Sequence, residues 1–140
     1  MVNSKNFFIT KKEGINFSKI SGDINKIHTD DSTGYNSLYG FSIAHGVLLL
    51  LKFFQQIKIS SKINNKNLYI IEINFKSPTK YNSKITSFLF KKKSDIFYKL
   101  FQENKIIATI KINFKNNLLV KKLNKISYKK KYLLSKKLIN

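Results

Sequence analysis

Residues 42–57 read SIAHGVLLLLKFFQQI, and this stretch decides the fold class. Its apolar side chains recur at helical spacing, at Ile43, Val47, Leu50, Leu51 and Phe54. The other sides of the predicted helix are also apolar, because they carry Leu48, Leu49 and Phe53. A helix that is apolar on nearly its whole circumference has to be enclosed by other elements. Because Lys52 interrupts the run and the run is too short to cross a bilayer, we expect a buried helix and no transmembrane segment.

Downstream of this helix the chain changes to the pattern of β-strands. Four runs rich in β-branched and aromatic residues follow, at Leu68–Phe75, Ile85–Phe90, Ile96–Phe101 and Ile106–Phe114. The first run stops at Ser77-Pro78, where proline removes a hydrogen-bond donor from the ladder. The short polar gaps at 91–95 and 103–105 suit hairpins, so we expect antiparallel pairing.

Upstream of the helix, the apolar segment Asn6–Thr10 predicts a first strand that ends in a charged turn at 11–14. Residues 16–39 are rich in Ser, Gly, Asp, Asn and Thr without a sustained period, which predicts an irregular segment or short helical turns. Loops of this length inside a compact domain are usually functional. The order of elements predicts an α+β domain in which an antiparallel sheet wraps one helix.

Length and composition limit the function classes. With 140 residues and no cysteine, the chain fits one domain and has neither disulfides nor thiolate chemistry. Its start lacks the pattern of a secretory signal, so we expect a cytoplasmic protein. The formal net charge of +20 suggests an anionic partner, but every basic residue is lysine, as an AT-rich genome produces. A nucleic-acid surface normally includes arginine, so no nucleic-acid partner is expected.

A lysine-rich tail follows the predicted domain. We divide the chain into a domain at 1–117 and a lysine-rich C-terminal extension at 118–140. Apolar residues recur in the extension at roughly helical spacing, as a helix packed on the domain, a frayed extension or a membrane-surface segment would show. The lack of Trp and Phe as interfacial anchors favours the first two readings.

A carboxylate and an imidazole lie five residues apart in the polar segment. Residues 21–30 read SGDINKIHTD, and a curled loop could bring Asp23 and His28 to one small molecule. General acid and base catalysis uses such a pair, because imidazole titrates near neutrality and a partly buried carboxylate can be tuned towards it. The alternative is structural, with Asp23 as a turn or cap residue and His28 as a hydrogen-bonded loop histidine.

The second histidine directly precedes the buried helix. Residues 39–46 read YGFSIAHG, and Gly46 at the helix start would allow close approach to free backbone N–H groups. Such groups stabilise negative charge that develops on a carbonyl oxygen. For His45 we favour a supporting role over direct proton transfer, and for Gly46 the alternative is close packing of the helix on the sheet.

Together the two stretches resemble the MaoC-like hydratases, also called hydratase 2. The family motif is an aromatic residue, a small residue, two variable positions and then Ser-Gly-Asp-x-Asn-Pro-x-His, which here reads Phe17 to His28. A small residue follows, here Gly34, and then Phe-Gly-x-x-Ile-Ala-His-Gly, here Tyr39–Gly46. Lys26 replaces the motif proline. Residues 74–78 also look like the family strand with Phe-x-x-Pro, so the likeness runs from about residue 8 to residue 114.

The resemblance implies a hotdog fold, usually dimeric, whose active site lies near the subunit interface. It implies reversible addition of water to a trans-2-enoyl thioester of coenzyme A or acyl carrier protein, giving the (R)-3-hydroxyacyl thioester. By this resemblance Asp23 and His28 are catalytic and the N–H of Gly46 binds the thioester oxygen. The supporting residues are Ser21, Gly22, Asn25 and His45. No metal and no cofactor are expected, since coenzyme A or phosphopantetheine enters as part of the substrate.

Three other functions remain open from the sequence. A 3-hydroxyacyl-carrier dehydratase would run the same chemistry in reverse. A hotdog thioesterase would release free thiol, although those enzymes usually lack the Ser-Gly-Asp-x-Asn-x-x-His loop. A non-catalytic hotdog dimer would use its basic tail to bind nucleic acid or anionic lipid.

Overall fold

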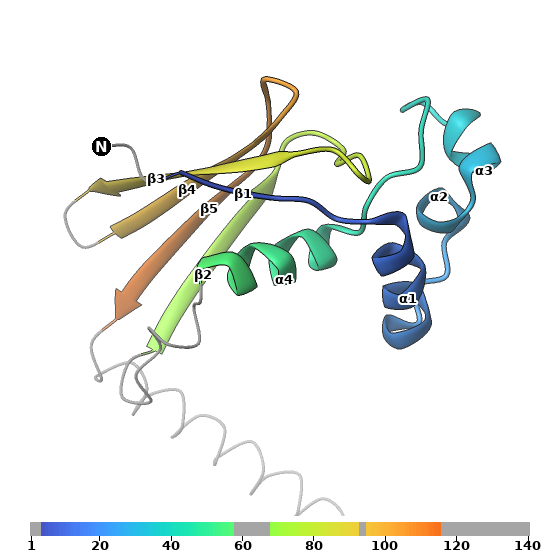
Figure 1. Cartoon of the computed structure of the whole chain (residues 1–140). Coiled ribbons are helices and arrows are strands. Elements are labelled where there is room, and N and C mark those ends of the chain that lie inside the picture. Colours follow the sequence, from blue (N-terminus) through green and yellow to red (C-terminus); the bar gives the residue numbers. More distant parts are fainter. Residues whose placement is uncertain (1–3, 58–67, 93–94, 116–140) are drawn as a thin grey trace, which may run out of the picture.

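The computed structural model describes residues 4–57, 68–92 and 95–115. Its elements in chain order are β1 (Ser4–Phe7), α1 (Lys11–Ser21), α2 (Lys26–Thr29), α3 (Asp31–Tyr35), α4 (Gly46–Ile57), β2 (Leu68–Phe75), β3 (Ile85–Lys92), β4 (Asp95–Gln102) and β5 (Lys105–Lys115). Figure 1 shows the strands on one side of the molecule and α1, α2 and α3 gathered at the other, beside the start of α4. The predicted α+β class is confirmed.

All strand pairs of the described sheet are antiparallel, in the order β1-β3-β4-β5-β2. The four predicted downstream strands lie where the sequence pattern placed them. The β4–β5 hairpin turns at Glu103 and Asn104, which both have positive φ, as a tight two-residue turn requires. The first strand lies at 4–7 rather than 6–10, because Thr10 leaves the strand to cap α1.

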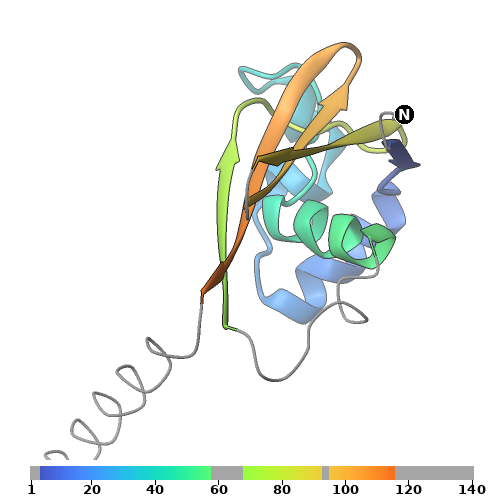
Figure 2. The ribbon, with the colours of Figure 1, turned by 90° about the vertical axis from the view of Figure 1, so that its left-hand side faces the viewer.

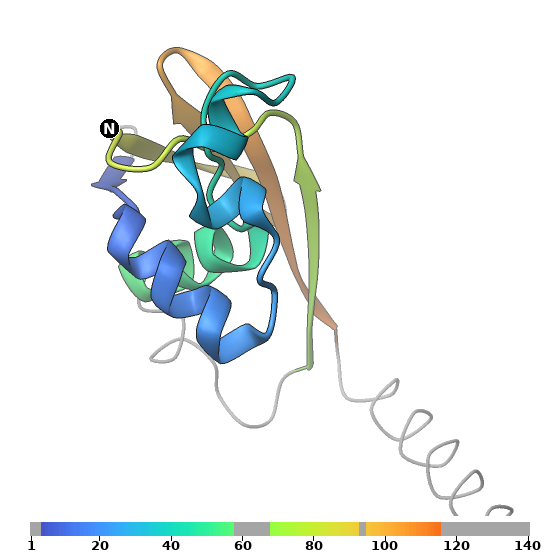
Figure 3. The same cartoon turned by 90° about the vertical axis from the view of Figure 1, so that its right-hand side faces the viewer.

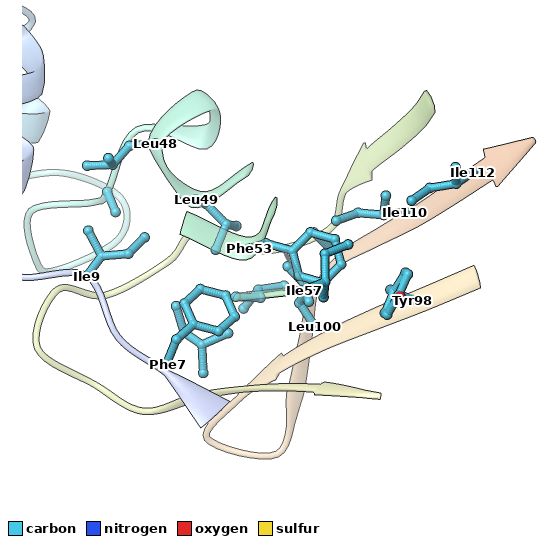
Figure 4. Packing of buried hydrophobic residues seen from close by; sticks show 14 residues of the cluster. Phe7, Ile9, Leu48, Leu49, Phe53, Ile57, Tyr98, Leu100, Ile110 and Ile112 are labelled. Atoms are coloured by element: carbon cyan, nitrogen blue, oxygen red, sulfur yellow. The ribbon is translucent and has the colours of Figure 1, made fainter. Parts of the chain in front are cut away.

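The core lies between α4 and one face of the sheet. Figure 2 shows α4 crossing that face, and Figure 4 shows the side chains of both layers meeting. The buried residues of α4 are Leu48, Leu49, Phe53 and Ile57. They pack against sheet residues that include Tyr98, Leu100, Ile110 and Ile112. The sheet therefore wraps the helix, as predicted.

The prediction that α4 is enclosed on all sides is wrong within the described parts of the chain. Val47 and Leu51 are 58% and 51% exposed. These two residues are one helical turn apart and so lie on the same face of α4. The sheet covers the opposite face, which leaves an apolar strip open. The helix also begins at Gly46 rather than Ser42, because the chain ahead of it pairs with residues near Pro78: Ile43 forms a bridge with Lys80, and the Ala44 N–H donates to the Thr79 oxygen at 2.8 Å.

The expectation of an irregular segment at 16–39 is wrong over its first part. Residues 11–21 form the eleven-residue helix α1, and the predicted charged turn at 11–14 is the first turn of that helix. Thr10 and Glu13 form a capping box, in which the Thr10 side chain accepts from the Glu13 N–H and the Glu13 carboxylate accepts from the Thr10 N–H. The short helices α2 and α3 agree with the predicted helical turns.

We expect Glu13→Gln to destabilise the fold by up to about 1 kcal/mol, the scale of a partly exposed ion pair, because glutamine can still close the capping box but has no charge to pair with Lys52. Glu13 closes the capping box and also pairs with Lys52 of α4, Nζ to Oε1 2.7 Å, which ties α1 to α4. The hydrogen bond from Lys52, followed by that from the Thr10 backbone, lowers the pKa of Glu13.

The pH dependence of that effect has a defined sign. A carboxyl with a lowered folded-state pKa contributes stability above its unfolded pKa, and the contribution is lost as pH falls through the folded value. The difference between wild type and Glu13→Gln in urea unfolding should therefore be full at pH 7 and shrink below about pH 4.5, the ordinary value. A difference that persists unchanged at pH 3 would contradict this account.

The C-terminal extension predicted at 118–140 lies outside the residues that the structure describes. The domain boundary at 117 therefore stays a prediction. Among the helices that are described, none has the length and hydropathy needed to span a membrane.

Candidate active site

The residues around Asp23 fold the turn that links α1 to α2. Gly22 ends α1 with φ of 77°, a left-handed conformation that glycine adopts without strain. The hydroxyl of Ser21 accepts from the Asp23 N–H at 3.2 Å, and Asp23 Oδ1 accepts from the Asn25 N–H at 3.4 Å. Asn25 then caps α2 by accepting from the Ile27 N–H at 3.1 Å. Each of the predicted supporting residues here has a local structural task.

Asp23 and His28 face each other across this turn. Asp23 Oδ2 lies 3.8 Å from His28 Nε2, with side chains 52% and 14% exposed. The other ring nitrogen, Nδ1, lies 2.8 Å from the backbone oxygen of Ile43. Because a carbonyl oxygen only accepts, Nδ1 carries the proton and Nε2 of neutral His28 presents its lone pair towards the carboxylate. The pair is too far apart for a direct hydrogen bond and close enough for both groups to contact one small molecule.

His45 lies behind this pair and is 3% exposed. Its ring stacks on that of His28, with centroids 4.0 Å apart, and meets the edge of Phe17 at 5.0 Å. His45 Nε2 lies 3.1 Å from Ser18 Oγ and 3.3 Å from the backbone oxygen of Asp23. Burial lowers the pKa of His45, and the nearby His28 ring adds to this effect against the opposing influence of Asp23. A neutral, buried imidazole fits the supporting role that we expected for His45.

Gly46 opens helix α4 next to His45. Its N–H has no hydrogen-bond partner within the described parts of the chain, as expected in the first turn of a helix. A Cβ at this position would lie 2.9 Å from the ring of Phe75 on β2. Both readings of Gly46 from the sequence therefore have a physical basis, because the glycine leaves a free donor and also admits a close aromatic neighbour.

Gly34 allows the polar segment at 16–39 to pack closely against the chain that leads into α4. A Cβ at Gly34 would overlap the backbone of Ser42. The Ser42 hydroxyl donates to Asp31 Oδ1 at 2.6 Å, and Lys11 Nζ donates to the same oxygen at 2.7 Å. Figure 3 shows α1, α2 and α3 packed around the chain that leads into α4. This packing brings together the two histidine stretches, which lie 17 residues apart in sequence.

Asp23, His28 and His45 also form the kind of cluster that can hold a divalent metal ion. They offer one ligand atom each, all within 4.8 Å of one another. The two imidazole rings are nearly parallel, with an angle of 27° between their planes, so their in-plane lone pairs do not converge on one point. His45 Nε2 is moreover directed at Ser18 and the Asp23 carbonyl. The arrangement suits proton transfer better than metal binding.

Two residues that contact His45, Ser18 and Tyr81, had no function assigned from the sequence. Ser18 contacts His45 from α1, and the Tyr81 hydroxyl lies 3.5 Å from His45 Nδ1. The motif included Ser18 only as a small residue. Tyr81 lies 36 residues beyond His45 in a polar loop, and nothing in its local pattern could have indicated the contact.

Comparisons with known proteins give a result at the level of structure. No family model and no curated protein sequence matches the chain. Solved structures do match, among them an (R)-hydratase from A. caviae involved in PHA biosynthesis, with a TM-score of 0.65 and 17% identity over 83% of this chain and 94% of that one. The chain has the hotdog fold.

Two further hotdog structures show the range of the likeness. R-hydratase PhaJ1 from Pseudomonas aeruginosa has a TM-score of 0.58 and 18% identity, over 84% of this chain and 81% of that one. The HadBC complex of Mycobacterium tuberculosis, a 3R-hydroxyacyl-ACP dehydratase, has a TM-score of 0.58 and 9% identity, over 81% and 92%. The hotdog fold expected from the two motifs is thus confirmed.

Proposed function

We propose that this chain is a MaoC-like hydratase that adds water reversibly to a trans-2-enoyl thioester. The observation that carries the proposal is the facing pair of Asp23 Oδ2 and His28 Nε2, 3.8 Å apart, with the His28 proton held on the far side of the ring by Ile43. The proton-accepting Nε2 of His28 and the partly exposed carboxylate of Asp23 therefore face the same small space. General acid and base catalysis needs this arrangement.

The proposed reaction returns the Asp23–His28 pair to its starting protonation state. A water molecule bound between the pair gives one proton to His28 Nε2 while its oxygen adds to C3 of the enoyl thioester. Electrons of the C2–C3 double bond move towards the thioester carbonyl, whose oxygen gains negative charge. The proton then passes from the pair to C2, which gives the (R)-3-hydroxyacyl thioester. Asp23 orients the water and stabilises the imidazolium while it exists.

Gly46 supplies the stabilising donor in this scheme. Its N–H lies at the positive end of the α4 dipole and next to His45, which stacks on His28. A thioester oxygen bound there places C2 and C3 towards the pair. The scheme needs no metal and no cofactor, because coenzyme A or the phosphopantetheine of acyl carrier protein arrives with the substrate. We place the enzyme in the cytoplasm, in line with its lack of cysteine.

The same site could run in the opposite direction, as a 3-hydroxyacyl-carrier dehydratase. Likeness to a 3R-hydroxyacyl-ACP dehydratase supports this second candidate, and a net charge of +20 suits an acidic carrier protein. The catalytic groups are identical in both directions. A non-catalytic module is disfavoured by the facing Asp23–His28 pair, which such a module would not need.

Carrier and reaction type can be tested together. Purified protein is mixed with crotonyl-coenzyme A and, separately, with crotonyl-acyl carrier protein, and the products are separated by mass and configuration. We expect a gain of one water and the (R)-3-hydroxybutyryl thioester on at least one carrier. Release of free thiol without hydration would instead assign a thioesterase, and no reaction on either carrier would remove the support for hydratase chemistry.

We also propose that two copies pair at the β2 edge of the sheet. That edge has no neighbour in the described chain, and beside it lie four exposed or half-exposed apolar residues, Val47, Leu51, Ile71 and Phe75. Val47 and Leu51 share a face of α4, and Phe75 packs against Gly46 at its start. A strip of this kind at a free edge is the usual mark of an interface.

Leu51→Glu should convert a dimer into a monomer by placing a charge in this strip. Light scattering after gel filtration measures the mass, and circular dichroism checks that the fold is kept. Phe90→Glu is the matched control, because Phe90 is similarly exposed on β3 but its side chain points to the face of the sheet away from α4. A monomeric wild type, or a Leu51→Glu variant that stays dimeric, would contradict the proposed pairing.

A further inference from the structure

The tautomer of His45 follows from its partners. Its Nε2 lies 3.3 Å from the backbone oxygen of Asp23, a group that only accepts hydrogen bonds. Nε2 therefore carries the proton, and Ser18 Oγ at 3.1 Å is a second acceptor for it. Since a neutral imidazole has one N–H, Nδ1 of His45 must be an acceptor that needs a donor.

Tyr81 supplies that donor. Its hydroxyl lies 3.5 Å from His45 Nδ1, on the side of the ring opposite Ser18. Tyr81 stands in the loop between β2 and β3, which is fastened by the Asn82 N–H donating to the Ile9 oxygen at 2.8 Å. Burial, with the carboxylates of Asp23 and Asp31, raises the pKa of Tyr81 to about 12. The hydroxyl consequently keeps its proton at every pH at which the protein would work.

Glycine at position 14 makes room for this contact. Gly14 and Ser18 are the two buried residues of α1, one turn apart on the face that meets His45 and Tyr81. A Cβ at Gly14 would overlap the hydroxyl and ring of Tyr81. Glycine inside a helix is unfavourable, so a glycine here needs a packing reason, and the Tyr81 hydroxyl provides it.

We infer that Tyr81 is a positioning residue of the active site, whose hydroxyl holds His45 in the Nε2–H tautomer and thereby fixes both Asp23 and His28. The His45 N–H holds the backbone of Asp23, and its ring supports that of His28 at 4.0 Å. In the other tautomer a lone pair of Nε2 would face the Asp23 oxygen at 3.3 Å, and the repulsion would shift the carboxylate. The catalytic consequence rests on the proposed hydratase function, whereas the tautomer does not.

The test is Tyr81→Phe, which removes the hydroxyl and keeps the ring. Nitrogen-15 NMR of histidine-labelled protein at neutral pH should show His45 as the pure Nε2–H form in the wild type and as a mixture in the variant. We expect kcat to fall ~10- to ~100-fold, as for a small misplacement of catalytic groups, with KM almost unchanged. Thermal unfolding should stay close to that of the wild type, because the ring still packs.

Two further variants complete the experiment. Tyr98→Phe removes the hydroxyl of another buried tyrosine, which packs against Phe53 in the core, and should change neither the His45 spectrum nor kcat. Gly14→Ala should reproduce the Tyr81→Phe signature by displacing the hydroxyl from the other side. A pure Nε2–H form in Tyr81→Phe with unchanged kcat would overturn the inference. If the wild type shows no hydratase activity, the proposed function fails, while the NMR spectra still decide the tautomer.

Discussion

Asp23→Asn should lower kcat by ~10²–10⁴-fold and leave the fold intact. The amide keeps the shape of the carboxylate but has no charge to orient the water or to stabilise a protonated His28. Asp23 is half exposed, and among the described residues its side chain accepts one long hydrogen bond, from the Asn25 N–H, so we expect folding not to depend on its charge. Steady-state rates on the better of the two crotonyl thioesters, with thermal unfolding of the same samples, measure both parts of the prediction.

Asp31→Asn is the matched control for that variant. It also replaces an aspartate by its amide, on the neighbouring helix α3, where the carboxylate pairs with Lys11 and Ser42 instead of facing His28. Its kcat should stay close to the wild-type value, because the amide oxygen of asparagine can still accept from Lys11 and Ser42, and the charge of an exposed ion pair contributes little. Equal losses in Asp23→Asn and Asp31→Asn would mean that the surface charge of this region matters and that the specific pair does not.

His28→Ala should lower kcat over the same range, ~10²–10⁴-fold, because the proton acceptor is removed. The substitution leaves a cavity where the His28 ring stacked on His45. Imidazole added to the buffer should restore part of kcat by binding in that cavity. Adding Asp23→Asn to this variant should cost little more, since residues that act as a unit have effects that do not multiply. Two effects that multiply fully would show that Asp23 and His28 act in separate steps.

The sequence alone was sufficient to place β2 to β5 and the central helix. Runs of β-branched and aromatic residues and short polar gaps located these strands to within a few residues, because strand formation depends on local side chains. Helix α1 was missed for a physical reason. Most of its residues are polar, and Thr10, Gly14 and Ser18 look like loop residues. In the structure Thr10 is the N-cap of α1, and Gly14 and Ser18 lie where α1 packs closely.

The candidate site was only partly predictable. Asp23 and His28 lie five residues apart, so one local turn is enough to bring their side chains together. The sequence motif indicated this proximity. His45 and Gly46 were found because they lie at the start of α4, the helix that the pattern predicted. The contact between Tyr81 and His45 depends on how the β2–β3 loop packs against α1, which no local pattern encodes.

The open strip on α4 shows a further limit. The sequence indicated an apolar circumference and hence full enclosure, but a pattern does not say which side is covered by the chain's own sheet. In the structure that sheet covers Leu49 and Phe53 and leaves Val47 and Leu51 exposed. A second copy of the chain, as proposed above, would cover the two residues that the chain's own sheet leaves exposed.

The most direct test of the central claim is the ultraviolet absorbance of the enoyl thioester, followed while wild-type protein and Asp23→Asn act on crotonyl thioesters in parallel. The account predicts that absorbance falls with catalytic turnover in the wild type and by at least ~10²-fold more slowly in Asp23→Asn. Absorbance that falls at the same rate with both proteins, or with neither while both are folded, would contradict the assignment of Asp23 and His28 as a water-adding pair.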